Sequence, residues 1–383
     1  CIRDRLGIVP VGYTILRAAG ATHTQAFPPW PLLHTLVSNT ILLAVCAAIL
    51  SGVIGVTQAL LIERTTLIGA PLWRILAVLP LAVPPYVLGI CTLALFRPRG
   101  IVERWLVTAQ WVEYGDIPFD AIFGVGGSAV LLACCLSPYV YLPVAAVLRQ
   151  GSQHFHELAQ LSGAGWFHRF RHVVLPVLAP AAGGGMLLVM LYALADFGVP
   201  ALLRLPTFST AIYARFAGQV DRAGAALLSV PLIICTIGLI VLEERLVGRS
   251  SAQINRSWRP LQLRHLGGWQ GLAQLCLGLV SGGALVLPIA TLVYWTIVTP
   301  SASELASSTP LGQLFVIGTR TIGYVVVIAS ITTLLAIAPA LLLRRGGRIG
   351  VVIARLSQAG YALPGVVVAL SIILVTTNLM PWV

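Results

Sequence analysis

Long apolar runs separated by short polar segments make up most of this chain. A helix needs about 20 residues to cross a lipid bilayer, and each backbone amide in lipid needs a hydrogen-bond partner. Eight runs are long enough: 36–62, 75–96, 124–148, 177–203, 223–243, 270–298, 315–343 and 358–380. A shorter run near the beginning, "LGIVPVGYTIL", is expected to be the end of a further span. The pattern predicts an all-α, polytopic transmembrane protein.

The composition supports this class. Charged residues make up 9% of the chain and hydrophobic residues 58%, whereas about 25% of an ordinary soluble domain is charged. The net charge of +12 comes from arginine alone, because the chain has no lysine. Nucleic-acid binding requires a basic face in polar surroundings, but these arginines lie mostly between apolar runs. The lipid bilayer is therefore the expected partner, and nucleic acid is not.

The cysteines follow the same pattern. Six of the seven lie inside apolar runs, and their spacing to histidine or aspartate is not that of metal ligands. Cysteines of this kind are usually small apolar packing residues. Neither disulfides nor a metal site is expected.

The arginines also predict the orientation, because cytoplasmic loops of membrane proteins carry an excess of positive charge. If the opening stretch faces the cytoplasm, fourteen arginines between the spans fall on that side and seven on the other. The outer ones are Arg97, Arg99, Arg104, Arg204, Arg215, Arg222 and Arg320. The polar segment 152–176 is then cytoplasmic.

The chain repeats itself weakly. Residues 40–64 align without gaps onto residues 321–345, with eight identical positions of 25. In each copy a proline follows within the next span, Pro84 and Pro364, where it is expected to kink a helix beside the translocation path. An even number of spans separates the copies, so they form a parallel duplication.

The repeat divides the chain into three parts. Residues 1–245 are expected to form a first half, with a partial first span, five further spans and the cytoplasmic segment 152–176. The polar and basic residues 246–269 are expected to be a cytoplasmic linker, and residues 270–383 the start of a second half with three spans. A second copy of the polar segment would fall near position 438, so the second half is expected to be incomplete.

The segment "HELAQLSGAGWFHRFRHVVLP" (156–176) concentrates polar residues in a chain that otherwise avoids them. Phe155, Leu158 and Leu161 follow helical spacing and form one apolar edge. Gly163 permits a sharp turn, and a second short helical run begins with Trp166. Topology alone would not require ordered glycines and large aromatic side chains. Exposed apolar groups at this place indicate docking to a partner or to headgroups.

This segment resembles the EAA loop of the membrane permeases of ATP-binding-cassette (ABC) importers, in which Glu-Ala-Ala precedes a glycine and a downstream Leu-Pro. The matching residues are Glu157, Ala159, Gly163, Leu175 and Pro176, whereas Leu158 replaces the first alanine. "LPLAVPPYVLGI" (79–90), "ADFGVPALL" (195–203) and "LPTFSTAIY" (205–213) are similar to the two-halved permeases of ferric-iron importers. Thiamine, phosphonate and polyamine permeases share much of this pattern.

The resemblance implies a type I ABC importer fold in the inner membrane of a prokaryote. It implies a solute, in the first place ferric iron, that an external solute-binding protein delivers. A lysine-free chain cannot contain a Gly-x-x-x-x-Gly-Lys-[Ser/Thr] loop, so ATP is expected to be used by a pair of separate cytoplasmic ATPases. The chain itself is expected to bind no cofactor and to have no catalytic residue. The expected ATPase-coupling residues are Phe155, Glu157, Ala159, Leu161, Gly163, Trp166 and Pro176, with Glu157 as a polar contact and Gly163 as the turn former.

Two further features lie inside the apolar runs. Asp196 is near the outer end of its run, where an ionisable group is costly and often functional. It either belongs to the translocation path or outer gate, or it is an interfacial acid satisfied by backbone groups or by an arginine such as Arg204. The run 183–185 of three glycines is expected to allow close helix packing rather than to bind phosphate.

Two other classes of function remain open. An ion-coupled secondary transporter also tolerates parallel repeats, but it would normally carry more intramembrane ionisable residues than Asp196. A scaffold protein would only dock a cytoplasmic partner. An associated ATPase favours the importer, and a required ion gradient favours the secondary transporter.

Overall fold

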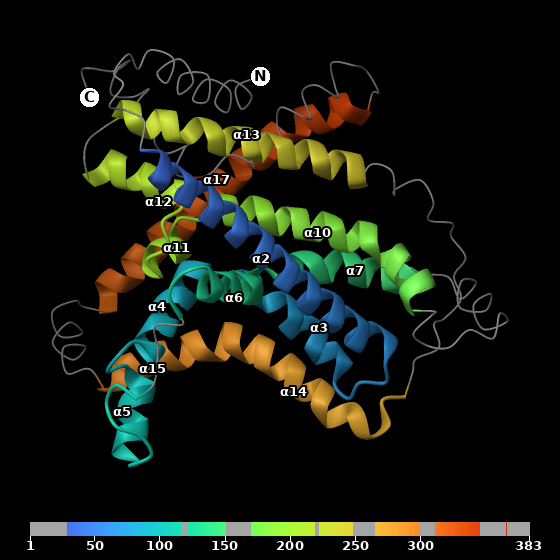
Figure 1. The fold of residues 1–383 in the computed structure, drawn as a ribbon. Coiled ribbons are helices and arrows are strands. Elements are labelled where there is room, and N and C mark those ends of the chain that lie inside the picture. The colour runs from blue at the N-terminus through green and yellow to red at the C-terminus, as the bar shows by residue number, and fades with distance from the viewer. Residues whose placement is uncertain are drawn as a thin grey trace.

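The computed structural model describes residues 29–116, 122–150, 170–218, 222–247, 265–298 and 311–344, and residue 365. Within these ranges the chain is helical and forms no sheet (Figure 1). The helices are α2 (Trp30–Arg64), α3 (Ala70–Val78), η2 (Leu79–Ala82), α4 (Pro85–Phe96), α5 (Ile101–Thr108), α6 (Val125–Leu136), α7 (Pro138–Gln150), η4 (Phe170–Val174), α10 (Leu175–Ala195), α11 (Gly198–Leu202), α12 (Phe208–Tyr213), η5 (Ala214–Gly218), α13 (Arg222–Val247), η6 (Gly267–Trp269), α14 (Gln270–Ser281), η7 (Gly282–Val286), α15 (Leu287–Val298) and α17 (Leu311–Arg344).

The described helices confirm the predicted membrane class. Five of them are long and apolar enough to cross a membrane. Two bent pairs of helices could each form one further span, which would raise the number to seven. The predicted spans 75–96 and 124–148 each correspond to a bent pair of helices with a break between them. The predicted span 177–203 is also too long, since α10 ends at Ala195. The predicted span 358–380 lies almost wholly outside the described residues.

Prolines account for both breaks. Pro84 precedes α4, and its carbonyl accepts the amides of Val87 and Leu88, so the new helix begins there. The helices on either side differ in direction by 91°. Pro138 begins α7 after a 43° bend. Because proline lacks an amide hydrogen and clashes with the preceding turn, it favours the start of a helix over its interior. The predicted distortion at Pro84 is confirmed, whereas Pro364 lies outside the described residues.

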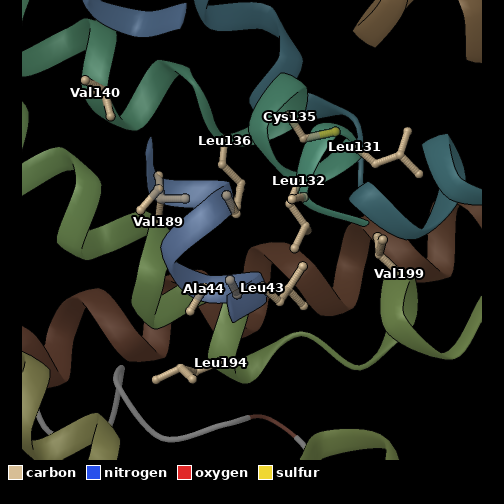
Figure 2. Packing of buried hydrophobic residues seen from close by; sticks show 14 of the residues in the cluster. Leu43, Ala44, Leu131, Leu132, Cys135, Leu136, Val140, Val189, Leu194 and Val199 are labelled. Carbon is tan, nitrogen blue, oxygen red and sulfur yellow. The ribbon is translucent and has the colours of Figure 1, made fainter. Parts of the chain in front are cut away.

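Helix α2 is the centre of the packing. It contacts α6, α7 and α10 along its length. Figure 2 shows Leu43 and Ala44 of α2 close to Leu132 and Leu136 of α6, with Val189 of α10 on the other side. All five side chains are at most 2% exposed. Helices of the second predicted half join this core at its edge, where α15 contacts α4 and α14 contacts α3.

Two glycines allow the closest helix approaches. A Cβ atom on Gly55 of α2 would lie 2.8 Å from the Ser137 carbonyl oxygen and 2.8 Å from the Tyr141 amide nitrogen. A Cβ atom on Gly185 of α10 would lie 2.5 Å from the Tyr139 carbonyl oxygen. The beginning of α7 is therefore held between α2 and α10. The packing role predicted for the run 183–185 is confirmed at Gly185, whereas a Cβ atom on Gly183 would meet open space.

We expect Gly55→Ala to destabilise the fold by about 1–3 kcal/mol, because two backbone segments would have to separate. Gly183→Ala is the control: it adds the same methyl group in open space and should be neutral or mildly stabilising, since alanine favours helix more than glycine does. Thermal unfolding of the detergent-purified variants measures both. Equal midpoints for the two variants would contradict the close approach at Gly55.

Candidate functional site

The predicted coupling segment lies mostly outside the described residues. This holds for Phe155, Glu157, Ala159, Leu161, Gly163 and Trp166. The structure describes α7, which ends at Gln150 just before the segment, and the last part of the segment from Phe170, where η4 begins. Leu175 and Pro176 form the first turn of α10, and both are exposed. The Leu-Pro pair of the motif therefore begins a span, as the sequence predicts.

A buried carboxylate connects three helices, α2, α3 and α7, next to this segment. The side chain of Glu63, at the end of α2, is 2% exposed. Arg74 of α3 donates from Nε and Nη2 to its two carboxylate oxygens, at 3.1 and 3.0 Å. Arg149 of α7 donates from Nη2 to Oε1 at 2.6 Å. The Tyr141 hydroxyl lies 3.4 Å from the same oxygen. We call Glu63, Arg74, Tyr141 and Arg149 the Glu63 cluster.

The ion pairs of the Glu63 cluster restrict the relative positions of α2, α3 and α7. Bidentate pairing of arginine with carboxylate restricts orientation as well as distance. The Glu63 side chain is buried, whereas those of Arg74 and Arg149 are 44% and 52% exposed. Loss of one arginine would therefore leave a buried carboxylate without one of its charged partners. Because Arg149 is followed within two residues by the predicted coupling segment, a displacement of that segment would reach α2 and α3 through Glu63.

No sequence motif indicates the Glu63 cluster. In the sequence, Arg74 and Arg149 are two of the arginines between predicted spans, and Glu63 belongs to no motif. A signal was present, because Glu63 ends an apolar run in a chain with 12 acidic residues in 383. Its two partners are 11 and 86 residues away, so only the tertiary structure shows the pairing.

At the opposite end of the bundle, Asp196 connects the end of α10 to α11 and α12. We call this set of contacts the outer joint. Asp196 follows the last residue of α10, and its carboxylate accepts the Val199 amide of α11 at 3.0 Å. Its carbonyl oxygen accepts the Ser209 hydroxyl of α12 at 2.8 Å. Burial raises the pKa of Asp196 to about 6, although backbone hydrogen bonds favour its ionised form. These contacts support the interpretation of Asp196 as an acid satisfied by backbone groups. Its role in a translocation path stays a prediction.

The same joint extends to the N-terminal third of α2. The Asn39 side-chain amide donates to the Pro206 carbonyl at 3.0 Å, and the Thr40 hydroxyl accepts the Phe208 amide at 3.1 Å. Thr207 begins α12 with a reciprocal capping box to Thr210. The segments 195–203 and 205–213, on which the family resemblance depends, thus form one hydrogen-bonded unit with α2.

The long-range contacts agree with the predicted sidedness. Arg74 and Arg149, both predicted to be cytoplasmic, meet at one carboxylate. Arg97, Arg99, Arg104 and Arg204, all predicted to be external, line one cavity elsewhere in the structure. We therefore call the end with the Glu63 cluster the inner end, and the end with Asp196 the outer end.

Comparison with known proteins assigns this architecture. Residues 55–252, just over half of the chain, match the family described as binding-protein-dependent transport system inner membrane component. The Fe(3+)-transport system permease protein FbpB 2 of Haemophilus influenzae is 28% identical over 95% of this chain and 68% of its own length. The ferric transport system permease protein FbpB of Actinobacillus pleuropneumoniae is 26% identical over 56% of this chain, which corresponds to 31% of the relative.

Relatives with other solutes match as well. The sulfate transport system permease protein CysT of Salmonella typhimurium is 33% identical over 42% of this chain and 54% of its own length. The match of the family across residues 55–252 includes the Glu63 cluster, the EAA-like segment and the outer joint at Asp196. The chain therefore belongs to the inner membrane components of binding-protein-dependent transport systems, as a multi-pass permease subunit of an ABC-type transporter.

Proposed function

We propose that this chain forms the translocation path of an ABC importer for ferric iron. The observation that carries the proposal is the similarity to a Fe(3+)-transport permease over 95% of this chain, which no other relative described above reaches. An external solute-binding protein would deliver the iron, and two cytoplasmic ATPases would drive its import. The chain would act as a transport subunit without an ATPase site of its own.

The proposed coupling is mechanical. The ATPases would dock on the EAA-like segment between α7 and α10, with Glu157 as a polar contact. Closure of the ATPases would move this segment, and the Glu63 cluster would pass the displacement to α2, which is the centre of the packing. A rigid-body switch between two states is the usual form of such a motion. The bend at Pro84 and the outer joint at Asp196 are the expected moving parts of the path.

Sulfate is the second candidate solute, because the CysT match has the higher identity, 33%, over its shorter range. Thiamine or polyamine import, and an ion-coupled secondary transporter, are further alternatives that the sequence leaves open. The outer arginines do not discriminate among these solutes by themselves.

The decisive experiment is uptake by proteoliposomes that contain the transporter purified with its associated subunits. We expect ATP-dependent, vanadate-sensitive uptake of radioactive ferric iron that requires the external binding protein. Radioactive sulfate, offered with its own binding protein, is the matched comparison. If only sulfate were taken up in an ATP-dependent way, the proposed solute would be sulfate and not ferric iron. Uptake that follows a proton or sodium gradient without ATP would contradict the importer.

A further inference from the structure

A cavity of about 680 Å³ opens at the outer end, between segments that are distant in sequence. The connection between α4 and α5, the residues after α11 and the end of α15 all contribute to its lining. The lining includes four arginines and no acidic side chain: Arg97, Arg99, Arg104 and Arg204. These are four of the seven arginines predicted to face outward, and all four are exposed.

The remaining wall of the cavity is apolar and aromatic. Phe123, Leu202 and Trp295 contribute partly buried side chains to it. The Arg204 guanidinium carbon lies 5.2 Å from the centre of the Phe123 ring, which holds this cation against the wall. Concave sites of roughly 300–1,000 Å³ with apolar walls and a few convergent polar groups typically bind small molecules.

The four cations have no acidic counterpart in the part of the chain that the structure describes. The ion pairs found there belong to Glu63 at the inner end. Glu103 is next to Arg104 in sequence, but it is 2% exposed and its carboxylate accepts the backbone amides of Arg99 and Gly115. Like charges around a concave, low-dielectric wall raise the positive potential inside it and concentrate anions there.

The backbone holds two of these arginines in an uncommon conformation. Arg99 has φ 58° and Arg204 has φ 54°, in the left-handed region that side-chain-bearing residues rarely adopt. Around Arg99, the Gly100 amide donates to the Arg97 carbonyl at 2.7 Å, and a Cβ atom on Gly100 would lie 2.6 Å from that oxygen. Such conformations persist where the surrounding structure determines them, commonly at ligand-binding sites.

We propose that this cavity binds a small multivalent oxyanion, of the sulfate, phosphate or polycarboxylate class, at the outer face of the permease. Arginine suits this ligand because its planar fork makes paired, charge-assisted hydrogen bonds to oxyanions. The aromatic wall limits the size of the ligand. The proposal concerns binding by this chain alone, so it can be tested without transport and does not depend on which solute is imported.

Calorimetric titration of the full chain, in nanodiscs of zwitterionic phosphatidylcholine, tests the proposal with sodium sulfate, phosphate and citrate. We expect at least one of these anions to bind, and chloride at equal ionic strength not to compete. Arg104→Gln and Arg204→Gln should each weaken binding about tenfold or more. The matched control, Arg320→Gln, removes one outer arginine of α17 that does not line the cavity and should leave binding unchanged. Absence of binding to the wild-type chain, or equal weakening by all three variants, would overturn the proposal.

Tryptophan fluorescence gives an independent readout, because Trp295 lines the cavity. The bound anion should change the emission of the wild-type chain, and Trp295→Phe should abolish that change while leaving heat of binding detectable. Phospholipid headgroups carry the same phosphate chemistry. Anionic lipid could co-purify with the wild-type chain but not with Arg204→Gln, while no free anion binds to either. This result would assign the cavity to a lipid headgroup and overturn the proposal for a soluble anion.

Discussion

Glu63→Gln is expected to lower the amount of solute imported per ATP hydrolysed by roughly tenfold or more. The substitution keeps the shape of the side chain but removes the charge that receives three hydrogen bonds from Arg74 and Arg149. Hydrogen bonds to charged groups contribute about 1.5–3 kcal/mol each, and 1.4 kcal/mol corresponds to a tenfold change in a population. The inner end of α7 would then be held to α2 mainly by apolar packing. Parallel measurement of uptake and ATP hydrolysis in proteoliposomes gives the ratio.

The adjacent residue provides the control. Arg64→Gln also changes one charge at the end of α2, but Arg64 forms no ion pair with the residues that the structure describes. It should retain the wild-type ratio. Arg149→Gln should resemble Glu63→Gln, and the double variant should be little worse than either, because both remove the same interaction. A normal ratio in Glu63→Gln, or an equal loss in Arg64→Gln, would exclude the Glu63 cluster from coupling.

Gly163→Val is expected to abolish transport while the protein still inserts into the membrane. Gly163 is the glycine of the EAA-like segment, and it lies outside the described residues. If it forms the predicted turn, a β-branched residue cannot adopt the required backbone, and the two short helical runs would lose their relative orientation. The ATPase should then co-purify poorly with the variant. Uptake and the amount of ATPase retained on the affinity-tagged chain measure the effect.

The neighbouring Ser162→Val variant is the control for this substitution. It introduces the same side chain one position earlier, where the motif makes no demand for glycine, and should retain ATPase binding. Normal uptake by Gly163→Val would contradict the assignment of the coupling segment. Membrane insertion of both variants is verified by their yield in the membrane fraction.

The reliability of prediction from sequence differs from element to element. The hydropathy pattern correctly placed the long helices α2 and α13 and the beginning of α10, because burial in lipid depends on local composition. It failed to locate the ends of segments such as 75–96, where Leu79–Ala82 and Pro84 divide an apolar run into two directions. Average hydropathy does not register a change of direction. The prolines indicate such a change of direction. At Pro84 the sequence predicts a kink, but it does not predict that the helix direction changes by 91°.

Candidate site residues were predictable where a short motif carries them. Leu175 and Pro176 begin α10 as expected, and Asp196 has the backbone partner that one of the two interpretations required. Glu63 was missed because its partners are not part of any motif. Arg97, Arg99, Arg104 and Arg204 were recognised only as external charges, since their common cavity is formed by segments about 100 residues apart.

The sequence by itself determined the membrane class and the family resemblance, and it predicts the sidedness of the polar segments. These properties depend on composition and on short patterns, which act through the bilayer and need no particular tertiary arrangement. Only the tertiary structure decided which charges meet. Two arginines converge on Glu63 at the inner end and four surround a cavity at the outer end. The physical reason is that ion pairing and electrostatic focusing depend on distances of a few ångströms, which helix packing sets.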